Sequence, residues 1–462
     1  MGKKAFNDFI EQRMKNKTVD FQTPLKRSKI KTFTSMLKTV STPKISEKKE
    51  VVKIKAQRNI LGQLLLLAMK NDIDMEKVLQ YPLSPVPWAL ATQDGLPLKT
   101  NKSTLLHKLE KKAFLEYESL NYDSVCIVDG NALFHSMTDI PNTYSQLAER
   151  LLSSLPNTTC VHFVTDTYKL DSIKSAERIR RGSSEDNDYA VGEHIQVSRK
   201  WKQFLCSENN KKALINFLKT EWEKDKYALK LKGKQLYFVN EERCYLFTSF
   251  DGKFVTACLV EDLYSSQEEA DTRIILHCLH ASQQPHTKKI VVKSPDTDVF
   301  LLLLSYCDAI GKTLIFQTGT GNSKRQINIT RMADSMSKRV RDALLGLHPF
   351  TGCDVTSCFA GKGKVKALKL LLADEGLVEL FARFGTTQSL PESEILNLEA
   401  FVCQLYGKPL SKSVDKLRFD KVRQSFTSKK KVLSDKTGLD FLSCLRVEMF
   451  FCSTYREQTF KQ

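Results

Sequence analysis

The run Ser124-Val-Cys-Ile-Val-Asp-Gly-Asn131 opens the part of the chain that decides the fold. Its four apolar residues Val125–Val128 have the length of a short strand that is buried on both faces, and an acidic residue follows them directly. The pattern recurs as Cys160–Val164 before Asp166 and as Lys289–Val292 before Asp296. Short all-apolar strands that alternate with helices are typical of a parallel α/β sheet with helices on both faces, so we predict this fold class.

The helices expected between these strands are Tyr144–Leu155, Glu269–Ala281 and Val299–Tyr306. They belong to a predicted domain over residues 121–372, in which residues 185–265 are expected as an insertion. The elements expected in that insertion are the amphipathic helix Lys211–Trp222 and the strand pair Gln235–Val239 and Cys244–Phe250. We expect Gly319-Thr-Gly321 to form a hairpin turn, since no helix with the Lys-Ser/Thr of a phosphate loop follows it.

The flanking regions have a different composition. Residues 1–58 contain sixteen Lys/Arg and five Asp/Glu, so they carry +11 of the net charge of +18, and we expect a disordered basic tail. Residues 59–120 are expected as a helical lead-in that ends with the helix Ser103–Tyr117. Residues 373–462 are expected as a helical extension, most clearly at Leu377–Phe384 and Leu396–Leu405.

The composition favours an intracellular protein with a polyanionic partner. A net charge of +18 over 462 residues suits nucleic acid. The longest apolar runs, Leu64–Met69 and Val299–Leu304, are too short to cross a bilayer, so no membrane contact is expected. Twelve cysteines without a paired CxxC pattern argue for reduced thiols. The basic runs Lys26–Lys31 and Lys429–Lys431 are either nuclear import signals or solvated lysine faces, and we expect a nuclear location.

Seven acidic residues recur in motifs along the middle of the chain: Asp129, Asp166, Glu269, Asp271, Asp296, Asp298 and Asp354. Acids that follow parallel strands, or that begin the helices after them, collect at the carboxyl edge of the sheet. A charge of about −7 in a small volume calls for cations, and carboxylate oxygens suit Mg²⁺ or Mn²⁺. The number of acids predicts two ions, which together activate water and stabilise the leaving oxygen in a displacement at phosphorus.

Each acid also has a structural interpretation when it is taken alone. Asp129-Gly is a common turn dipeptide, and Glu269 and Asp271 are acids of the kind that favour a helix N-terminus. Asp298 is expected to cap the helix Val299–Tyr306 whether or not it binds metal. His277 and His280, with Cys278 between them, resemble a zinc set, but their spacing on an apolar helix makes core or rim positions the expected outcome.

The order of these acidic motifs resembles the metal site of the flap endonuclease and 5′-exonuclease superfamily, the larger relatives of PIN-domain nucleases. Two basic motifs extend the resemblance: Lys174 with Ala176-Glu-Arg-Ile-Arg-Arg181, and Gly361-Lys-Gly-Lys-Val-Lys-Ala367. More narrowly, Glu269-Ala-Asp-Thr-Arg273, Ser294-Pro-Asp-Thr-Asp-Val299 and Phe350-Thr-Gly-Cys-Asp354 look like a group of uncharacterised animal proteins associated with mobile elements. That narrower resemblance implies no substrate.

The resemblance covers residues 123–372 and implies a PIN-like fold followed by a helix-turn-helix. It gives Lys174, Arg178 and Arg181 a catalytic role on the scissile phosphate, and Gly361, Gly363, Lys364 and Lys366 a role in nucleic-acid binding. Thr167 stands where the family often has glycine, and the 102 residues between Asp166 and Glu269 make a longer arch region. The implied function is a structure-specific nuclease acting on DNA or RNA; the alternative is an inactive nucleic-acid-binding or scaffold protein with the same fold.

Overall fold

The protein is described by a computed structural model that covers residues 7–19, 67–79, 89–92, 96–111, 114–116, 123–168, 188–386, 390–407 and 411–427. The chain divides into two compact units. The first consists of Met1–Pro24 and Leu106–Arg341, and the second of Leu25–Leu105 and Asp342–Gln462. The predicted lack of structure in the basic tail falls mostly outside the described residues.

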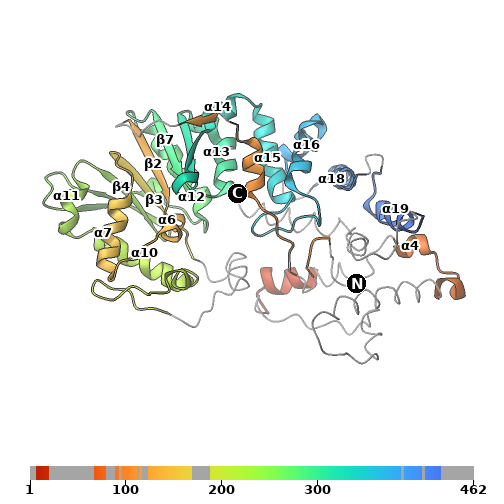
Figure 1. The fold of residues 1–462 in the computed structure, drawn as a ribbon, viewed down its shortest axis with the longest axis horizontal. Helices are drawn as coiled ribbons and strands as arrows, with labels where there is room; N and C mark the ends of the chain where they lie inside the picture. The colour runs from red at the N-terminus through yellow and green to blue at the C-terminus, as the bar shows by residue number, and fades with distance from the viewer. Residues whose placement is uncertain are drawn as a thin grey trace. The chain divides into compact units, whose positions relative to one another are not determined.

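A nine-stranded sheet in the order β1-β9-β8-β7-β2-β3-β4-β5-β6 forms the centre of the first unit (Figure 1). Its five middle strands are parallel: β8 (Thr313–Thr318), β7 (Lys289–Lys293), β2 (Ser124–Asp129), β3 (Cys160–Val164) and β4 (Gln235–Asn240). Antiparallel strands close both ends, with β9 (Arg325–Asn328) and β1 (Leu115–Glu116) at one and β5 (Arg243–Thr248) and β6 (Thr256–Leu259) at the other. The predicted α/β class with a mainly parallel sheet is confirmed.

Helices cover both faces of this sheet. One face packs against α6 (Gly130–Ser136), α7 (Tyr144–Ser154) and α10 (Glu208–Trp222), and the other against α12 (Ala270–Gln283), α13 (Thr297–Ile310) and α14 (Ile329–Asp334) (Figure 1). On the first face the rings of Phe163, Trp222 and Phe238 contact one another, with centroids 5.2 to 5.8 Å apart. Aromatic side chains bury a large apolar area, so this cluster stabilises the junction between strands and helices.

Short elements complete the first unit: η1 (Ile10–Lys15), α9 (Trp201–Phe204), η3 (Asp225–Tyr227), α11 (Ala228–Leu231), η4 (Glu261–Leu263) and η5 (Gly321–Ser323). The second unit contains α4 (Met75–Leu79), α16 (Lys364–Leu372), α17 (Glu375–Ala382), α18 (Glu392–Leu405) and α19 (Val414–Thr427). The division of the chain falls within α5 (Ser103–Leu109) and within α15 (Lys338–Phe350). In the second unit Phe350 contacts both Phe381 and Phe401, so three helices share one aromatic core.

The strands and helices nearest the predicted site lie within a few residues of their expected positions, and β8 and β9 form the expected hairpin through Gly319. Two regions differ. The expected helix Ser103–Tyr117 ends at Leu109, because Leu115 and Glu116 pair with β9 instead. Residues 185–265 are not separate from the sheet: β4 pairs with β3 in parallel, and β5 and β6 extend the sheet further.

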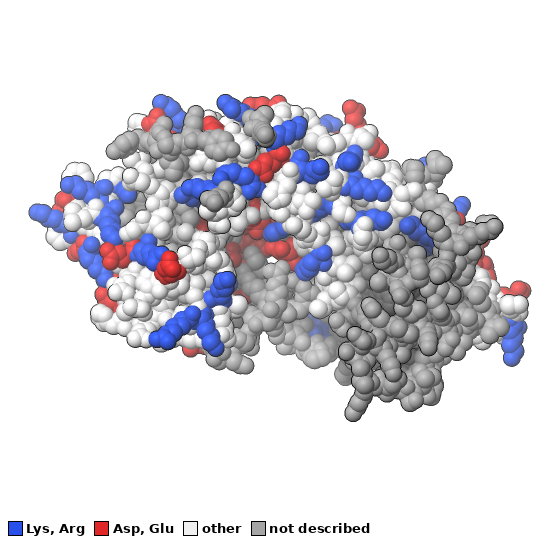
Figure 2. All heavy atoms as spheres, viewed as in Figure 1, with Lys and Arg blue, Asp and Glu red and all other residues white. Residues whose placement is uncertain are grey.

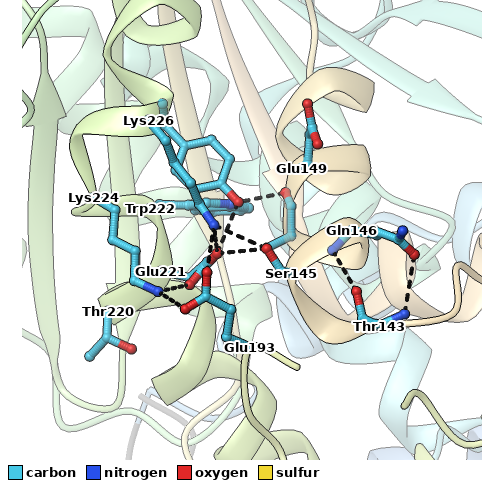
Figure 3. A network of polar contacts seen from close by, with 12 residues as sticks. Thr143, Ser145, Gln146, Glu149, Glu193, Thr220, Glu221, Trp222, Lys224 and Lys226 are labelled. Carbon is cyan, nitrogen blue, oxygen red and sulfur yellow. Dashed lines mark hydrogen bonds and ion pairs between the residues drawn. The ribbon is translucent and has the colours of Figure 1, made fainter. Parts of the chain in front are cut away.

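A buried polar network fastens α7 to the end of α10 (Figure 3). The buried carboxylate of Glu221 pairs with Lys224 at 2.6 Å and Lys226 at 2.5 Å, and it accepts a hydrogen bond from Ser145 Oγ at 3.1 Å. Glu193 pairs with the same two lysines. A buried charge that has several partners is stable where it lies but costly to disrupt, so this network fixes the geometry of the α7–α10 side of the sheet.

Among the described residues, none of the helices has both the length and the apolar character needed to cross a membrane. On the face seen in Figure 2, lysine and arginine side chains of the described residues are spread out, with acidic side chains between them.

Candidate metal centre

Three neighbouring parallel strands each deliver an aspartate to the same edge of the sheet. Asp129 is the last residue of β2, Asp166 follows β3 by two residues, and Asp296 follows β7 by three. Because β2 pairs in parallel with both β3 and β7, the three strands end together. Asp129 and Asp296 therefore lie at the ends of neighbouring strands.

Asp271, Asp296 and Asp298 form the most compact part of this acidic set. One oxygen atom from each carboxylate lies within 4.8 Å of the others, and all three residues are partly buried. Carboxylates so close together repel one another, and hard oxygen atoms in this number are the donors that Mg²⁺ and Mn²⁺ prefer. The donor set therefore fits a divalent cation.

The start of α13 explains why two of these acids meet. Asp296 has an extended backbone and caps the helix, since its Oδ1 accepts a hydrogen bond from the backbone N–H of Asp298 at 2.8 Å. The prediction that Asp298 is the cap is therefore wrong: the helix begins at Thr297, and Asp298 lies in its first turn. Proline disfavours a helical conformation at the residue before it, Ser294, and capping by Asp296 starts the helix two residues before the apolar pattern indicates.

Asp129 is buried and held at both carboxylate oxygens. Its Oδ1 accepts from the backbone N–H of Ala132 at 2.9 Å, and its Oδ2 accepts from Ser294 Oγ at 3.0 Å. Burial raises the pKa of Asp129 to about 6, and the nearby carboxylates of Asp166 and Asp296 act in the same direction, against the lowering effect of the two hydrogen bonds. The carboxyl therefore has a fixed orientation and a strong preference for a cationic neighbour.

Ser294 is a positioning residue that the sequence did not reveal. It is buried, and besides donating to Asp129 it accepts a hydrogen bond from the backbone N–H of Asp296 at 3.1 Å. One hydroxyl thus links the acids of two strands. The sequence signal for a role of Ser294 was its position in Ser-Pro-Asp before a helix start. Nothing in the neighbouring sequence indicates its bond to Asp129, which lies 165 residues away.

Arg273 is a second positioning residue that the sequence did not reveal, and it is only 1% exposed. It donates to Thr167 Oγ1 at 2.9 Å, to Ser265 O at 3.0 Å and to Glu241 O. Asp166 is fixed by the same region, because its Oδ1 accepts from the backbone N–H of Ala270 at 2.8 Å. The strand end that carries Asp166 and the helix start that carries Glu269 and Asp271 are therefore joined.

Glu269 occupies the N-cap position of α12 without making a side-chain capping bond. Asp354 belongs to the second unit, where its Oδ2 lies 2.9 Å from Lys102 Nζ. The structure thus brings together six of the seven predicted acids in the first unit. Lys174, Arg178 and Arg181 lie outside the described residues.

The predicted nucleic-acid-binding residues are all in the second unit. Gly361 has a positive φ of 66°, and Gly363 caps α16; both are exposed. Lys366 is exposed, although its Nζ also donates to Leu405 O at 2.6 Å. The prediction is wrong for the ammonium of Lys364, which is 1% exposed and donates to His348 O at 2.6 Å and Thr351 Oγ1 at 3.0 Å.

Of the histidines considered for zinc, His277 lies in the core between β3 and α12, and His280 is partly buried with its ring 5.8 Å from that of His162, in line with the expected core or rim positions. His162 Nδ1 is 2.8 Å from His277 Nδ1, and the ring of His162 stacks on Tyr237 at 4.2 Å. Burial lowers the pKa of His162 well below its ordinary value and that of His277 to about 3. Both imidazoles are therefore neutral, and they form part of the packing between sheet and helix.

No protein-family model matches this chain, and no curated protein matches it. Among solved structures, the chain is similar to the catalytic core of Rad2 in complex with a DNA substrate. The TM-score is 0.28 and the sequence identity 14%, over 72% of this chain and 78% of that one.

Proposed function

We propose that this protein is a metal-dependent nuclease that hydrolyses phosphodiester bonds in DNA or RNA. The observation that carries the proposal is the convergence of Asp271, Asp296 and Asp298, with oxygen atoms within 4.8 Å, beside the aspartates of two neighbouring strand ends. An edge of a parallel sheet where several loops meet is the usual place for a ligand. The five acidic motifs in their order along the chain support the same proposal.

In this proposal six acids of the first unit hold two divalent ions, Mg²⁺ or Mn²⁺: Asp129, Asp166, Glu269, Asp271, Asp296 and Asp298. Bound there, the metal would supply an activated water and neutralise charge on the leaving oxygen. The chain itself supplies fixed ligand positions. Ser294 and the Ala132 N–H orient Asp129, and the Ala270 N–H orients Asp166. Preorganised ligands lose little entropy when a cation binds.

Further parts of the proposal rest on the sequence alone. Asp354 as a seventh ligand, Lys174, Arg178 and Arg181 as contacts to the scissile phosphate, and a preference for branched or single-stranded ends come from the resemblance to flap endonucleases. A nuclear location rests on the basic runs at residues 26–31 and 429–431, and imaging of a fluorescent fusion with and without these runs tests it. The resemblance to proteins associated with mobile elements suggests a setting but no substrate.

The decisive experiment incubates the purified protein with labelled flap, single-stranded and duplex DNA and RNA, with Mg²⁺ or Mn²⁺ and beside a chelator control. Asp296→Asn serves as the site variant. Cleavage that needs metal and is lost in Asp296→Asn is the expected result. Binding without cleavage, under every metal condition, would replace the proposal by the alternative of an inactive nucleic-acid-binding protein.

A further inference from the structure

Lys293, the last residue of β7, has a partly buried side chain without a carboxylate partner among the described residues. Three other cations near this part of the sheet are paired. Lys288 lies 2.9 Å from Asp123, Lys289 lies 4.0 Å from Glu116, and Arg325 lies 2.5 Å from Glu110. Burying an ammonium group without a partner is costly, and side chains kept in that condition mark candidate binding sites.

Lys293 is not the counter-ion of the acidic edge. Its register partner on β2 is Val128, and successive residues of a strand point to opposite faces, so Asp129 points away from it. Val291, two residues earlier, belongs to the core on the α7–α10 side. The ammonium therefore lies at the carboxyl edge of that face, next to the acids along the chain but across the sheet from Asp129.

A second unsatisfied group stands beside Lys293. Gln317 of β8 is its register partner, and Ile315, two residues before Gln317, belongs to the same core as Val291. Gln317 is only 5% exposed, yet its Oε1 has no hydrogen-bond partner among the described residues. Buried amides nearly always have partners, and the oxygen and nitrogen of an amide exchange places by a simple rotation. This amide can therefore offer an N–H group to a ligand.

A third polar group adds positive charge at the same place. Lys324 lies in the turn between β8 and β9, is exposed, and acts electrostatically on Lys293. Burial lowers the pKa of the Lys293 ammonium most strongly; Cys126 acts in the opposite direction, and the charge of Lys324 adds a smaller lowering effect. Two like charges beside an unpaired amide destabilise the empty site, and an anionic oxygen would satisfy all three groups.

We propose that Lys293, Gln317 and Lys324 form an anion subsite that binds a backbone phosphate of the nucleic-acid strand. This proposal rests on the proposed nuclease function. The subsite adjoins the catalytic edge directly, because Lys293 precedes Ser294, the residue that links Asp129 to Asp296. A phosphate held there positions the strand without touching the reacting bond, as phosphate contacts generally do.

The test compares Lys293→Met with Lys289→Met, a control on the same strand whose ammonium is paired with Glu116. Binding of a labelled single-stranded oligonucleotide is measured by anisotropy in a chelator across a salt series. We expect Lys293→Met to bind ~10-fold more weakly, with a salt slope reduced by about 0.7, the value for one phosphate contact on a single strand. Lys293→Met should also melt at a higher temperature than the wild type, because it removes an unpaired charge. Lys289→Met should bind the oligonucleotide as the wild type does and melt at no higher temperature.

Inorganic phosphate provides an arm that does not depend on nuclease activity. We expect millimolar phosphate to raise the melting temperature of the wild type and of Lys289→Met, and to have a smaller effect on Lys293→Met and on Gln317→Leu. Equal affinity and an equal phosphate response in Lys293→Met and Lys289→Met would overturn the subsite even if the protein cleaves nucleic acid. Loss of the phosphate response in Lys293→Met would support the subsite even if no cleavage is found.

Discussion

Neutralising Asp298 should make the metal-free protein more stable. Its carboxylate lies within 4.8 Å of those of Asp271 and Asp296. Two unit charges at that distance repel by about 1 kcal/mol in water and ~3.5 kcal/mol at an effective dielectric constant of 20. The three residues are partly buried, so the value for each pair lies between these limits. Asp298→Asn keeps the shape and removes two such repulsions, so we expect ~2–7 kcal/mol more stability. The corresponding rise in Tm is at least about 4 °C.

Metal should reverse this order. A cation that binds only the folded protein raises its stability by about 2.7 kcal/mol at 100 times Kd, and Asp298→Asn loses a ligand for that cation. Thermal melts in a chelator and in a Mg²⁺ or Mn²⁺ series measure both effects. Asp308→Asn is the control on the same helix: Asp308 pairs with Arg341 at 2.6 Å, so this variant should be less stable in the chelator and keep its metal response.

Two results would refute the reasoning about the acidic site. The first is a lower Tm for Asp298→Asn than for the wild type in the chelator. That result would mean that the Asp298 carboxylate stabilises the folded protein more, through its other contacts, than it destabilises it by repelling Asp271 and Asp296. The second is a wild-type Tm that does not change over millimolar Mg²⁺ and Mn²⁺.

Ser294→Ala removes the hydroxyl that links two acids, so we expect a loss of ~1–2 kcal/mol in urea melts and at least ~10-fold slower single-turnover cleavage; an unchanged rate would show that the link does not position Asp129. His162 and His277 are neutral in the folded state because burial lowers their pKa values, so stability is complete above pH 6.5, the ordinary histidine pKa, and falls by ~1.4 kcal/mol per histidine for each pH unit below it. Thermal melts against pH should show a flatter acid limb in His277→Phe, and an identical limb would contradict this. Lys364→Met should lower stability by ~2–3 kcal/mol with affinity for nucleic acid unchanged, whereas Lys366→Ala should weaken binding and reduce its salt slope. The opposite assignment of the two effects would restore a binding role for Lys364.

The strands and the acids at their ends could be predicted because both signals are local. An apolar run followed by an aspartate indicates a buried strand and the residue just beyond it, and β2, β3 and β7 follow that rule. The order of the strands in the sheet was not needed, since parallel strands that share a sheet end at the same edge. This is why Asp129, Asp166 and Asp296 could be grouped from the sequence.

What escaped prediction depends on contacts between distant segments. Ser294 and Arg273 stand in the quoted motifs, yet their partners lie on other strands and loops. Lys364 follows a glycine motif that suggests a surface role, but its side chain turns inward to the end of α15. The two residues of β1 form a strand only because β9 offers an edge. No local pattern of apolar and polar residues contains this information.

The Arg273 contacts also bear on how far this protein can be reduced in size. Residues 185–265 resemble a removable insertion, but the turn between β4 and β5 provides Glu241, whose carbonyl accepts from Thr167 Oγ1 at 3.0 Å and from Arg273. Glu241 adopts a positive φ of 54°, an uncommon conformation for a residue with a side chain. A shortened protein without residues 185–265 would lose the carbonyls of Glu241 and Ser265, and with them two acceptors of the buried Arg273 guanidinium directly behind Asp166. The hairpin and the acidic edge must therefore be retained, transplanted or redesigned as one unit.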